Sequence, residues 1–197
     1  QFKSTVSSLV EQGVTGLVFD LRDNAGGLRS AAEEVIAYLM PLGQYGTETD
    51  KNGTVTSLVS KSNNQLSLPT ATLINSGTAG EAEFFAGVLQ EFSFTTVVGE
   101  TSAGKAKYQE YFTLEADNSA IKLTVGEYSR LKNGSWQDQG ITPDLESALT
   151  DSQKANIRLT AVADDPQVKT ALSQIGNPVT PKTGSANKAN SAAANGG

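Results

Sequence analysis

The chain contains no histidine and no cysteine among its 197 residues. Without cysteine it can form no disulfide, no thiol nucleophile and no cysteine-ligated metal site. Without histidine it can form no Ser-His-Asp triad, no Cys-His pair and no histidine-ligated zinc site. Any general base in this chain must therefore be a Lys, Asp, Glu or Tyr side chain.

Positive charge is scarce, because 15 Lys and Arg residues stand against 21 Asp and Glu residues, and the net charge is −6. With no Lys/Arg-rich run, the sequence predicts neither nucleic-acid binding nor attachment to an anionic membrane. No apolar run approaches the roughly 18 residues of a transmembrane helix, so no membrane insertion is expected. No signal peptide is visible, and the chain opens on a helix-like segment, so we expect a fragment whose start has been removed.

Apolar residues are especially rare at one end of the chain. From Gly176 onward the sequence reads GNPVTPKTGSANKANSAAANGG, which offers almost nothing to bury. Such a composition cannot offset the entropy lost on ordering. We expect residues 1–150 to form the core domain, residues 151–176 a C-terminal helical segment packed on it, and residues 177–197 a disordered tail.

Helical and strand patterns alternate in the first part of the chain. Apolar residues recur at helical spacing over residues 2–10 and 82–92, and also at Leu28, Ala32, Val35, Ile36 and Leu39. Short apolar runs at 16–22, 69–75 and 95–100 are typical of buried strands. NG at residues 52 and 53 predicts a hairpin, period-two alternation predicts strands at 108–114 and 121–125, and a last helix is expected over 166–175. This order predicts an α/β layered domain with a β-rich second half.

The segment DLRDNAGG (residues 20–27) stands where a predicted strand gives way to a helix. Two adjacent glycines, Gly26 and Gly27, can turn their N–H groups toward a ligand beside a helix N-terminus that favours negative charge. The pattern indicates either an oxyanion hole for acyl transfer or a tight turn that simply needs glycine.

The segment GETSAGK (residues 99–105) has the spacing of a phosphate-binding loop. Ala106 stands where that loop needs Ser or Thr for magnesium, and a strand pattern follows instead of a helix, so the nucleotide interpretation fails. Lys105 is then either a solvated surface charge or a general base in a cleft, because burial lowers the pKa of a lysine. In a chain without histidine it is the strongest candidate base for serine chemistry.

The segment NSGTAGEAEFFAGVLQ (residues 75–90) combines a strand end, a glycine turn and a helix start. A nucleophile fits such a junction, because the helix dipole stabilises its anion. Thr78, followed by Glu81 three residues later, also predicts a capping box at the start of this helix.

Together these three segments resemble the C-terminal processing peptidases, the tail-specific serine peptidases of family S41. In that family DLR-x-N-x-GG is followed by a serine-bearing turn similar to T-A-S-A-A-E and then by G-E-x-x-x-G-K-x-x-x-Q. This chain supplies DLRDNAGG, TAGEAE and GETSAGKAKYQ in that order, and its GITPDLE and DDPQVKTAL resemble two closing motifs. The resemblance covers roughly residues 1–175.

The resemblance implies a ClpP/crotonase-like fold and a Ser–Lys mechanism. By position, Lys105 would be the general base, and Gln109 would orient it. The oxyanion hole would consist of the backbone N–H groups of Gly26 or Gly27 and of Glu81.

The nucleophile position of the family falls on Gly80. Glycine has no side chain that could attack a carbonyl, and losing a nucleophile typically costs about 10⁶ in kcat. Glu81, usually a small residue in the family, would place a carboxylate beside the oxyanion site. Two histories fit Gly80, an engineered substitution and natural divergence, and the second departure at Glu81 favours divergence.

The expected function is that of a Ser–Lys peptidase domain acting on protein C-termini, inactive or impaired because of Gly80. The alternative is a pseudopeptidase that serves as a peptide-binding or scaffold module. A crotonase-type acyl-CoA enzyme shares the core layout, but GITPD and GK-x-x-x-Q belong to the peptidase pattern.

The resemblance also implies the partners and the setting. The expected partner is an extended peptide or unfolded protein, and no metal or other cofactor is expected. The PDZ module of the family would lie upstream or be missing. The family suggests a bacterial, extracytoplasmic setting that is periplasmic, cell-surface or secreted.

Overall fold

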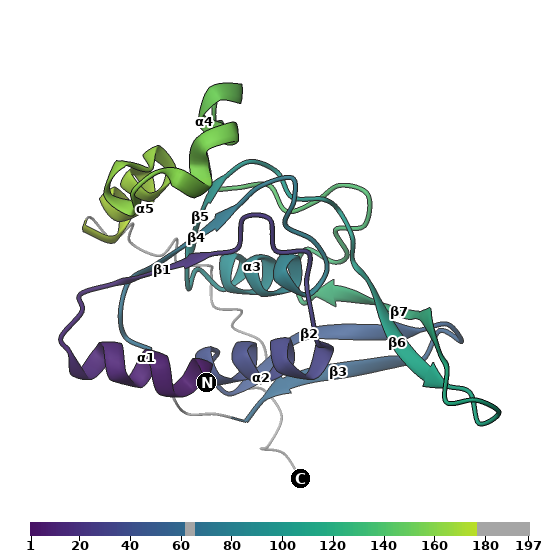
Figure 1. Ribbon diagram of the computed structural model, residues 1–197. Coiled ribbons are helices and arrows are strands. Elements are labelled where there is room, and N and C mark those ends of the chain that lie inside the picture. Colours follow the sequence, from purple (N-terminus) through teal and green to yellow (C-terminus); the bar gives the residue numbers. More distant parts are fainter. Residues whose placement is uncertain (62–65, 177–197) are drawn as a thin grey trace, which may run out of the picture.

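A computed structural model describes residues 1–61 and 66–176, and the tail predicted at residues 177–197 lies outside this part of the chain. Two sheets carry the described fold, with helices packed between and outside them (Figure 1). The order of helices and strands agrees with the α/β layered architecture predicted from the sequence.

The first sheet is parallel, with the strand order β1-β4-β5-β8. Its strands span Leu17–Asp20 (β1), Thr70–Ile74 (β4), Thr96–Gly99 (β5) and Leu145–Glu146 (β8). Every residue of the central strand β4 is buried. Alternate residues serve different layers, because side chains of a strand point to opposite faces. Ala71 and Leu73 pack with helix α5 (Pro166–Gly176), whereas Ile74 belongs to the larger core on the other side.

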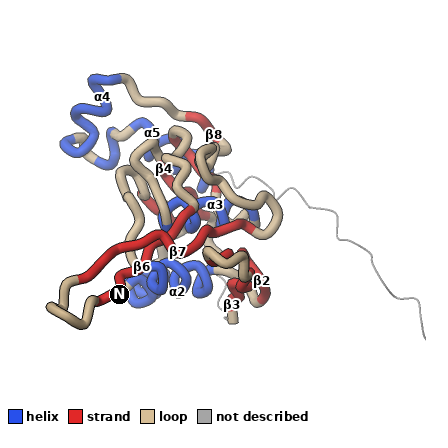
Figure 2. Tube along the Cα trace, turned by 90° about the vertical axis from the view of Figure 1, so that its right-hand side faces the viewer, coloured by secondary structure: helices blue, strands red, loops and turns tan. Residues whose placement is uncertain are grey.

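The second sheet is antiparallel, with the strand order β3-β2-β7-β6 (Figure 2). Its strands span Gly43–Asp50 (β2), Val55–Ser60 (β3), Lys107–Thr113 (β6) and Ala120–Arg130 (β7). The β2–β3 hairpin turns at residues 51 and 52, where Gly53 N–H donates to the Asp50 carbonyl (3.0 Å), and confirms the hairpin predicted from NG. β6 is an edge strand that pairs with β7.

Helix α3 (Glu81–Glu91) lies between the two sheets, and its residues 82–89 are all buried. Phe84 stacks on Tyr128 of β7 and on Trp136, with ring centroids 4.5 and 5.7 Å apart. Helix α2 (Arg29–Leu39) adds Ile36 and Leu39 to the same core, and helix α1 (Phe2–Glu11) packs against it through Phe2. This packing fixes where α3 begins, at the carboxyl end of β4.

The remaining predictions of secondary structure differ from the structure in detail. Leu28 precedes α2 and is 73% exposed, so its assignment to the buried face of that helix is wrong. β1 is an edge strand and is therefore only partly buried. Helix α4 (Asp151–Asn156) and two short 3-10 turns, Ile157–Leu159 and Val162–Asp164, lie within the segment 151–176 that was expected to be helical. Strand β8 was not predicted, because two residues leave no periodic signal. Within the described residues, no helix has the length and apolar character needed to cross a membrane.

Candidate active site

The turn between β4 and α3 is tied to the loop that follows β1. The Asn75 side chain accepts hydrogen bonds from the N–H groups of Asp23 (2.9 Å) and Gly77 (3.0 Å), and its amide donates to the Asp23 carboxylate (3.1 Å). The Thr78 hydroxyl donates to the Leu21 carbonyl (2.8 Å). These contacts bring DNAGG and the turn before α3 together, as the candidate site requires.

The predicted helix cap is wrong in its residues. Thr78 is fully buried, and its hydroxyl accepts from Asn75 N–H (3.0 Å) instead of capping α3. The N-cap residue is Gly80, and the carboxylate that reaches back to its N–H belongs to Glu83 (3.0 Å). The glycine turn continues further than the sequence pattern suggested, which moves the cap by two residues.

Gly80 adopts a backbone conformation that residues with side chains rarely adopt, with φ 62° and ψ −126°. A Cβ added there would lie 3.6 Å from the carbonyl oxygen of Ala25 and 3.9 Å from the Cα of Gly26, both ordinary contact distances. The position therefore has room for a side chain that would face the DNAGG loop. Its obstacle is the backbone geometry and not the available space.

Glu83 holds the Gly80 turn and the Lys105 loop together. Its side chain is fully buried and accepts hydrogen bonds from Ser102 Oγ (2.5 Å) and from the N–H groups of Gly104 (2.7 Å), Lys105 (2.8 Å) and Gly80 (3.0 Å). The N–H groups of Gly80 and Lys105 donate to the same oxygen, Oε2. Because both main-chain nitrogens donate to one oxygen, the nitrogens of Gly80 and Lys105 lie close together. The predicted nucleophile position and the loop of the predicted base are therefore neighbours in space.

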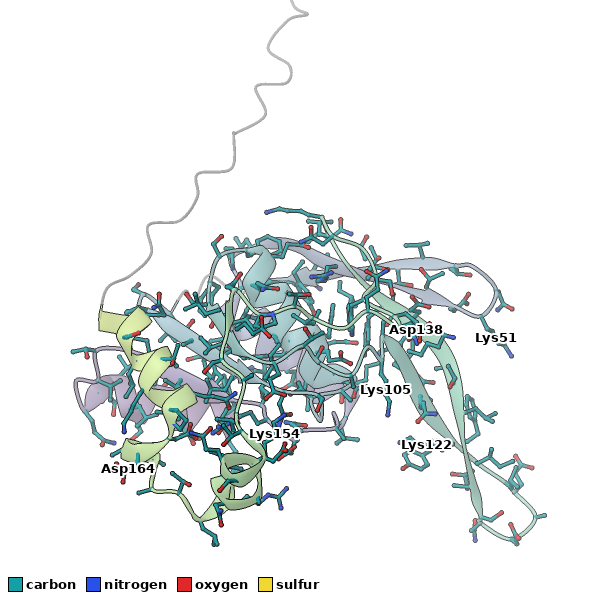
Figure 3. All side chains as sticks on the ribbon, turned by 90° about the horizontal axis from the view of Figure 1, so that it is seen from above. Lys51, Lys105, Lys122, Asp138, Lys154 and Asp164 are labelled. Atoms are coloured by element: carbon teal, nitrogen blue, oxygen red, sulfur yellow. The ribbon has the colours of Figure 1, made fainter. Side chains whose placement is uncertain are left out.

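Lys105 and Gln109 are both exposed, and Lys105 is labelled in Figure 3. Lys105 is therefore not desolvated in this conformation. The amide nitrogen of Gln109 lies 3.4 Å from the hydroxyl of Thr124 on β7, and no hydrogen bond joins it to Lys105 within the described residues. The proposed roles of base and orienting residue remain predictions.

The predicted oxyanion hole is occupied by a carboxylate of the chain itself. The N–H of Gly26 points to the Asn24 side chain (3.0 Å), whereas the N–H of Gly27 donates to Oε2 of Glu81 (3.1 Å). The Glu81 main-chain nitrogen lies nearby, 3.2 Å from where a Cβ of Gly26 would stand. A carboxylate thus takes the position where an anionic intermediate would need the N–H group of Gly27.

The two buried hydroxyl groups near the turn already have partners. Thr78 Oγ1 donates to Leu21, and Ser102 Oγ donates to Glu83 while it accepts from the N–H of Ile141 (2.6 Å). Neither hydroxyl is available to replace a serine at position 80. Within the described residues, no cluster of three acidic side chains could hold a metal ion.

A cavity of about 840 Å³ opens beside the turn, at the carboxyl ends of β1, β4 and β5. Open parallel sheets bind ligands at this edge. Asp23 and Asn75 line the cavity on the side of the turn, and Lys154 of α4, paired with Glu100 (2.9 Å), lies across it. The cavity and the Gly80 turn therefore share two loops.

Sequence reasoning missed Glu83 and Asn75 as organisers of the site. Glu83 is the last letter of TAGEAE and stands three residues after Gly80, which is the spacing of a helix-start carboxylate. That signal was assigned to Glu81 because the start of the helix was placed two residues too early.

Comparison with known proteins places these features in a family context. The model of peptidase family S41 matches residues 1–147. The carboxyl-terminal-processing protease of Synechocystis sp. is 34% identical over 136 residues, which cover 69% of this chain and 32% of that protein. The carboxy-terminal processing protease CtpA of Bacillus subtilis is 31% identical over 156 residues, which cover 78% of this chain and 33% of that protein.

Solved structures of processing proteases share the fold of this chain. The photosystem II D1 C-terminal processing protease superposes with a TM-score of 0.66 and 28% identity, covering 84% of this chain and 44% of that one. Mature CPAF, at 16% identity and a TM-score of 0.67, shares the fold. The chain spans about a third of the length of the curated relatives it matches.

Proposed function

Because the chain belongs to peptidase family S41, we propose that it carries the peptide-binding cleft of a C-terminal processing peptidase and binds extended polypeptides without efficient cleavage. Its relatives are named as processing proteases, and the order of the three motifs follows theirs. In this proposal Lys105 and Gln109 are the remnants of the Ser–Lys site. An extracytoplasmic setting is part of the same proposal.

One observation carries the proposal: the carboxylate of Glu81 accepts a hydrogen bond from Gly27 N–H beside a nucleophile position that is glycine. Acyl transfer needs both an attacking atom and donors aimed at the developing oxyanion. Losing the attacking atom costs about 10⁶ in kcat. Losing a donor of the oxyanion hole costs a further 10² to 10³, roughly.

The rest of the cleft supports peptide binding. Glu83 still brings the Lys105 loop against the Gly80 turn, through main-chain N–H groups that do not depend on the missing serine. Such a frame is what a binding module or scaffold would keep after turnover is lost. The second candidate, a peptidase with low residual turnover, differs only in whether cleavage is measurable.

The test is hydrolysis of an unfolded protein by the wild type, Gly80→Ser and the double variant Gly80→Ser/Glu81→Ala. We expect no cleavage by the wild type and weak cleavage by the single variant, because the carboxylate still occupies Gly27 N–H. The double variant should cleave about 100-fold faster than the single one, and adding Lys105→Ala should abolish its activity. Strong cleavage by the wild type would refute the proposal.

A further inference from the structure

The cavity at the carboxyl ends of β1, β4 and β5 lies beside the candidate site, yet the central residues of that site, Gly80, Glu83 and Lys105, do not line it. Its outer wall is an arm, residues 148–164, which leads from β8 through α4 to α5. This arm lies above the edge of the parallel sheet in Figure 1. None of its residues is buried. A segment that packs so loosely leaves the space beneath it open to a ligand.

Aliphatic side chains line the cavity from two sides. The first group comes from the parallel sheet and α5, and the second comes from the arm: Leu73, Val168 and Leu172 in the first, and Leu149, Ile157 and Val162 in the second. Val162 is 73% exposed and Leu172 is 51% exposed, so part of this apolar wall faces water. No described lining residue is aromatic, so a flat ring would find nothing to stack on. The wall therefore suits a flexible aliphatic chain, which would bury its apolar surface.

One cation at the cavity has hydrogen-bond donors to spare. Arg22 and Lys154 also line the cavity, and each is paired with a carboxylate at 2.9 Å or less. The side chain of Arg158 is 82% exposed and lies 3.7 Å from Oδ2 of Asp23, which is beyond hydrogen-bonding distance. No described residue accepts a hydrogen bond from its guanidinium. A planar guanidinium with free N–H groups can bind a carboxylate through two parallel hydrogen bonds.

The acidic side chains of the lining have less capacity left for a ligand. Each of the four already accepts a hydrogen bond, namely Asp20, Asp23, Glu100 and Asp165. The unfilled capacity therefore belongs to the cation, and it favours an anionic head group over a cationic one.

We infer that this cavity binds a free aliphatic carboxylic acid, with its chain between α5 and the arm and its carboxylate on the guanidinium of Arg158. The volume of about 840 Å³ lies within the range of small-molecule sites. A polypeptide segment fits less well, because its main-chain amides would be buried against aliphatic walls without partners. The inference goes beyond the proposed function, since it concerns another class of ligand and another set of residues.

The test is isothermal titration calorimetry of the whole chain with hexanoate, octanoate and decanoate below their micelle concentrations. Affinity should rise on the order of ten-fold with each added pair of methylenes. Decanoate should bind the wild type about five-fold more tightly than decanamide, which has the same chain and no charge. This preference should vanish in Arg158→Gln. It should persist in Lys51→Gln, because Lys51 lies far from the cavity residue Lys154 (Figure 3).

Asp23→Asn tests the head group with the opposite sign. The new side chain can still accept the hydrogen bond from the Asn75 amide, but it removes the negative charge beside Arg158. Decanoate should therefore bind about three-fold more tightly to this variant than to the wild type. Weaker binding to Asp23→Asn, or equal binding of decanoate and decylamine by the wild type, would contradict the assignment of an anionic head group.

Leu172→Ser tests the wall, with Leu159→Ser as its matched control. Both leucines are exposed, at 51% and 86%, so circular dichroism and Tm should change little in either variant, but only Leu172 lines the cavity. Affinity for decanoate should fall about five-fold in Leu172→Ser only. No binding of decanoate by the wild type, affinity independent of chain length, or equal affinity of the two leucine variants overturns the inference. None of these results bears on the proposed function, which the hydrolysis assay tests separately.

Discussion

Replacing Gly80 by alanine tests whether the backbone before α3 is held in a conformation reserved for glycine. The φ of 62° and ψ of −126° lie in a region that costs a residue with a Cβ about 1–3 kcal/mol. The added Cβ meets its nearest neighbour at 3.6 Å, so no clash adds to this cost. Alanine also lowers the entropy of the unfolded chain, which offsets about 0.4–1 kcal/mol.

The expected result is a loss of about 1–2 kcal/mol in the free energy of unfolding, or about 2–8 °C in Tm for a chain of this size. Fluorescence of Trp136, the single tryptophan, reports the transition, because its indole is fully buried and stacks on Phe84 of α3. Urea titrations of the wild type and of Gly80→Ala, fitted with a common slope, give the difference directly.

Gly27→Ala is the matched control, because Gly27 lies in the same site. Its φ is outside the positive region, and a Cβ there would have no neighbour within 4 Å. The control should be unchanged or slightly stabilised. If Gly80→Ala proved as stable as the wild type while the control behaved as expected, the strain assigned to Gly80 would not exist.

Three further predictions follow from buried or partly buried charges. Glu83→Ala leaves four hydrogen-bond donors without their acceptor. It should lower the free energy of unfolding by about 3–5 kcal/mol, measured by urea unfolding. Burial alone would raise the pKa of Glu100, but hydrogen bonds from Lys154 and a main-chain N–H outweigh it and lower the pKa. The folded state then holds fewer protons at this carboxyl than the unfolded chain, so stability is lost as the pH falls below about 4, less steeply in Glu100→Gln. Arg22→Met leaves the buried carboxylate of Asp165 without the guanidinium that lies 2.8 Å from it, and should lower the free energy of unfolding by about 3 kcal/mol. Adding Asp165→Asn should restore part of this stability, measured by thermal unfolding.

Much of the fold could be predicted from local patterns. Apolar residues that recur every three to four positions mark the helices that contain Val6, Ile36 and Leu89. The short run of residues 70–74, rich in apolar side chains, marks a buried strand. Such signals depend on residues that are close together in the sequence. The errors fell where context decides: Leu28 was placed on a helix face, yet it lies in the preceding turn, where no neighbour covers it.

The candidate site could be predicted only in part. The resemblance of three motifs to the C-terminal processing peptidases predicts that Gly26, Gly80 and Lys105 belong to one site. It did not indicate that Glu83, and not Glu81, reaches back to the start of α3. A carboxylate at either position fits the local pattern, and the choice depends on where the turn ends.

The sequence alone determined which chemistry this chain can perform. It contains no histidine and no cysteine, and position 80 is glycine and not serine, so it lacks these nucleophiles and bases whatever its fold. Only the tertiary structure decided where the charges lie. The Glu81 carboxylate meets an N–H donor 54 residues away along the chain, and the buried Glu83 accepts from donors of two segments, the Gly80 turn and the loop of residues 102–105. Such contacts depend on how α3 packs between two sheets, and that packing is set by interactions among distant segments that no local periodicity records.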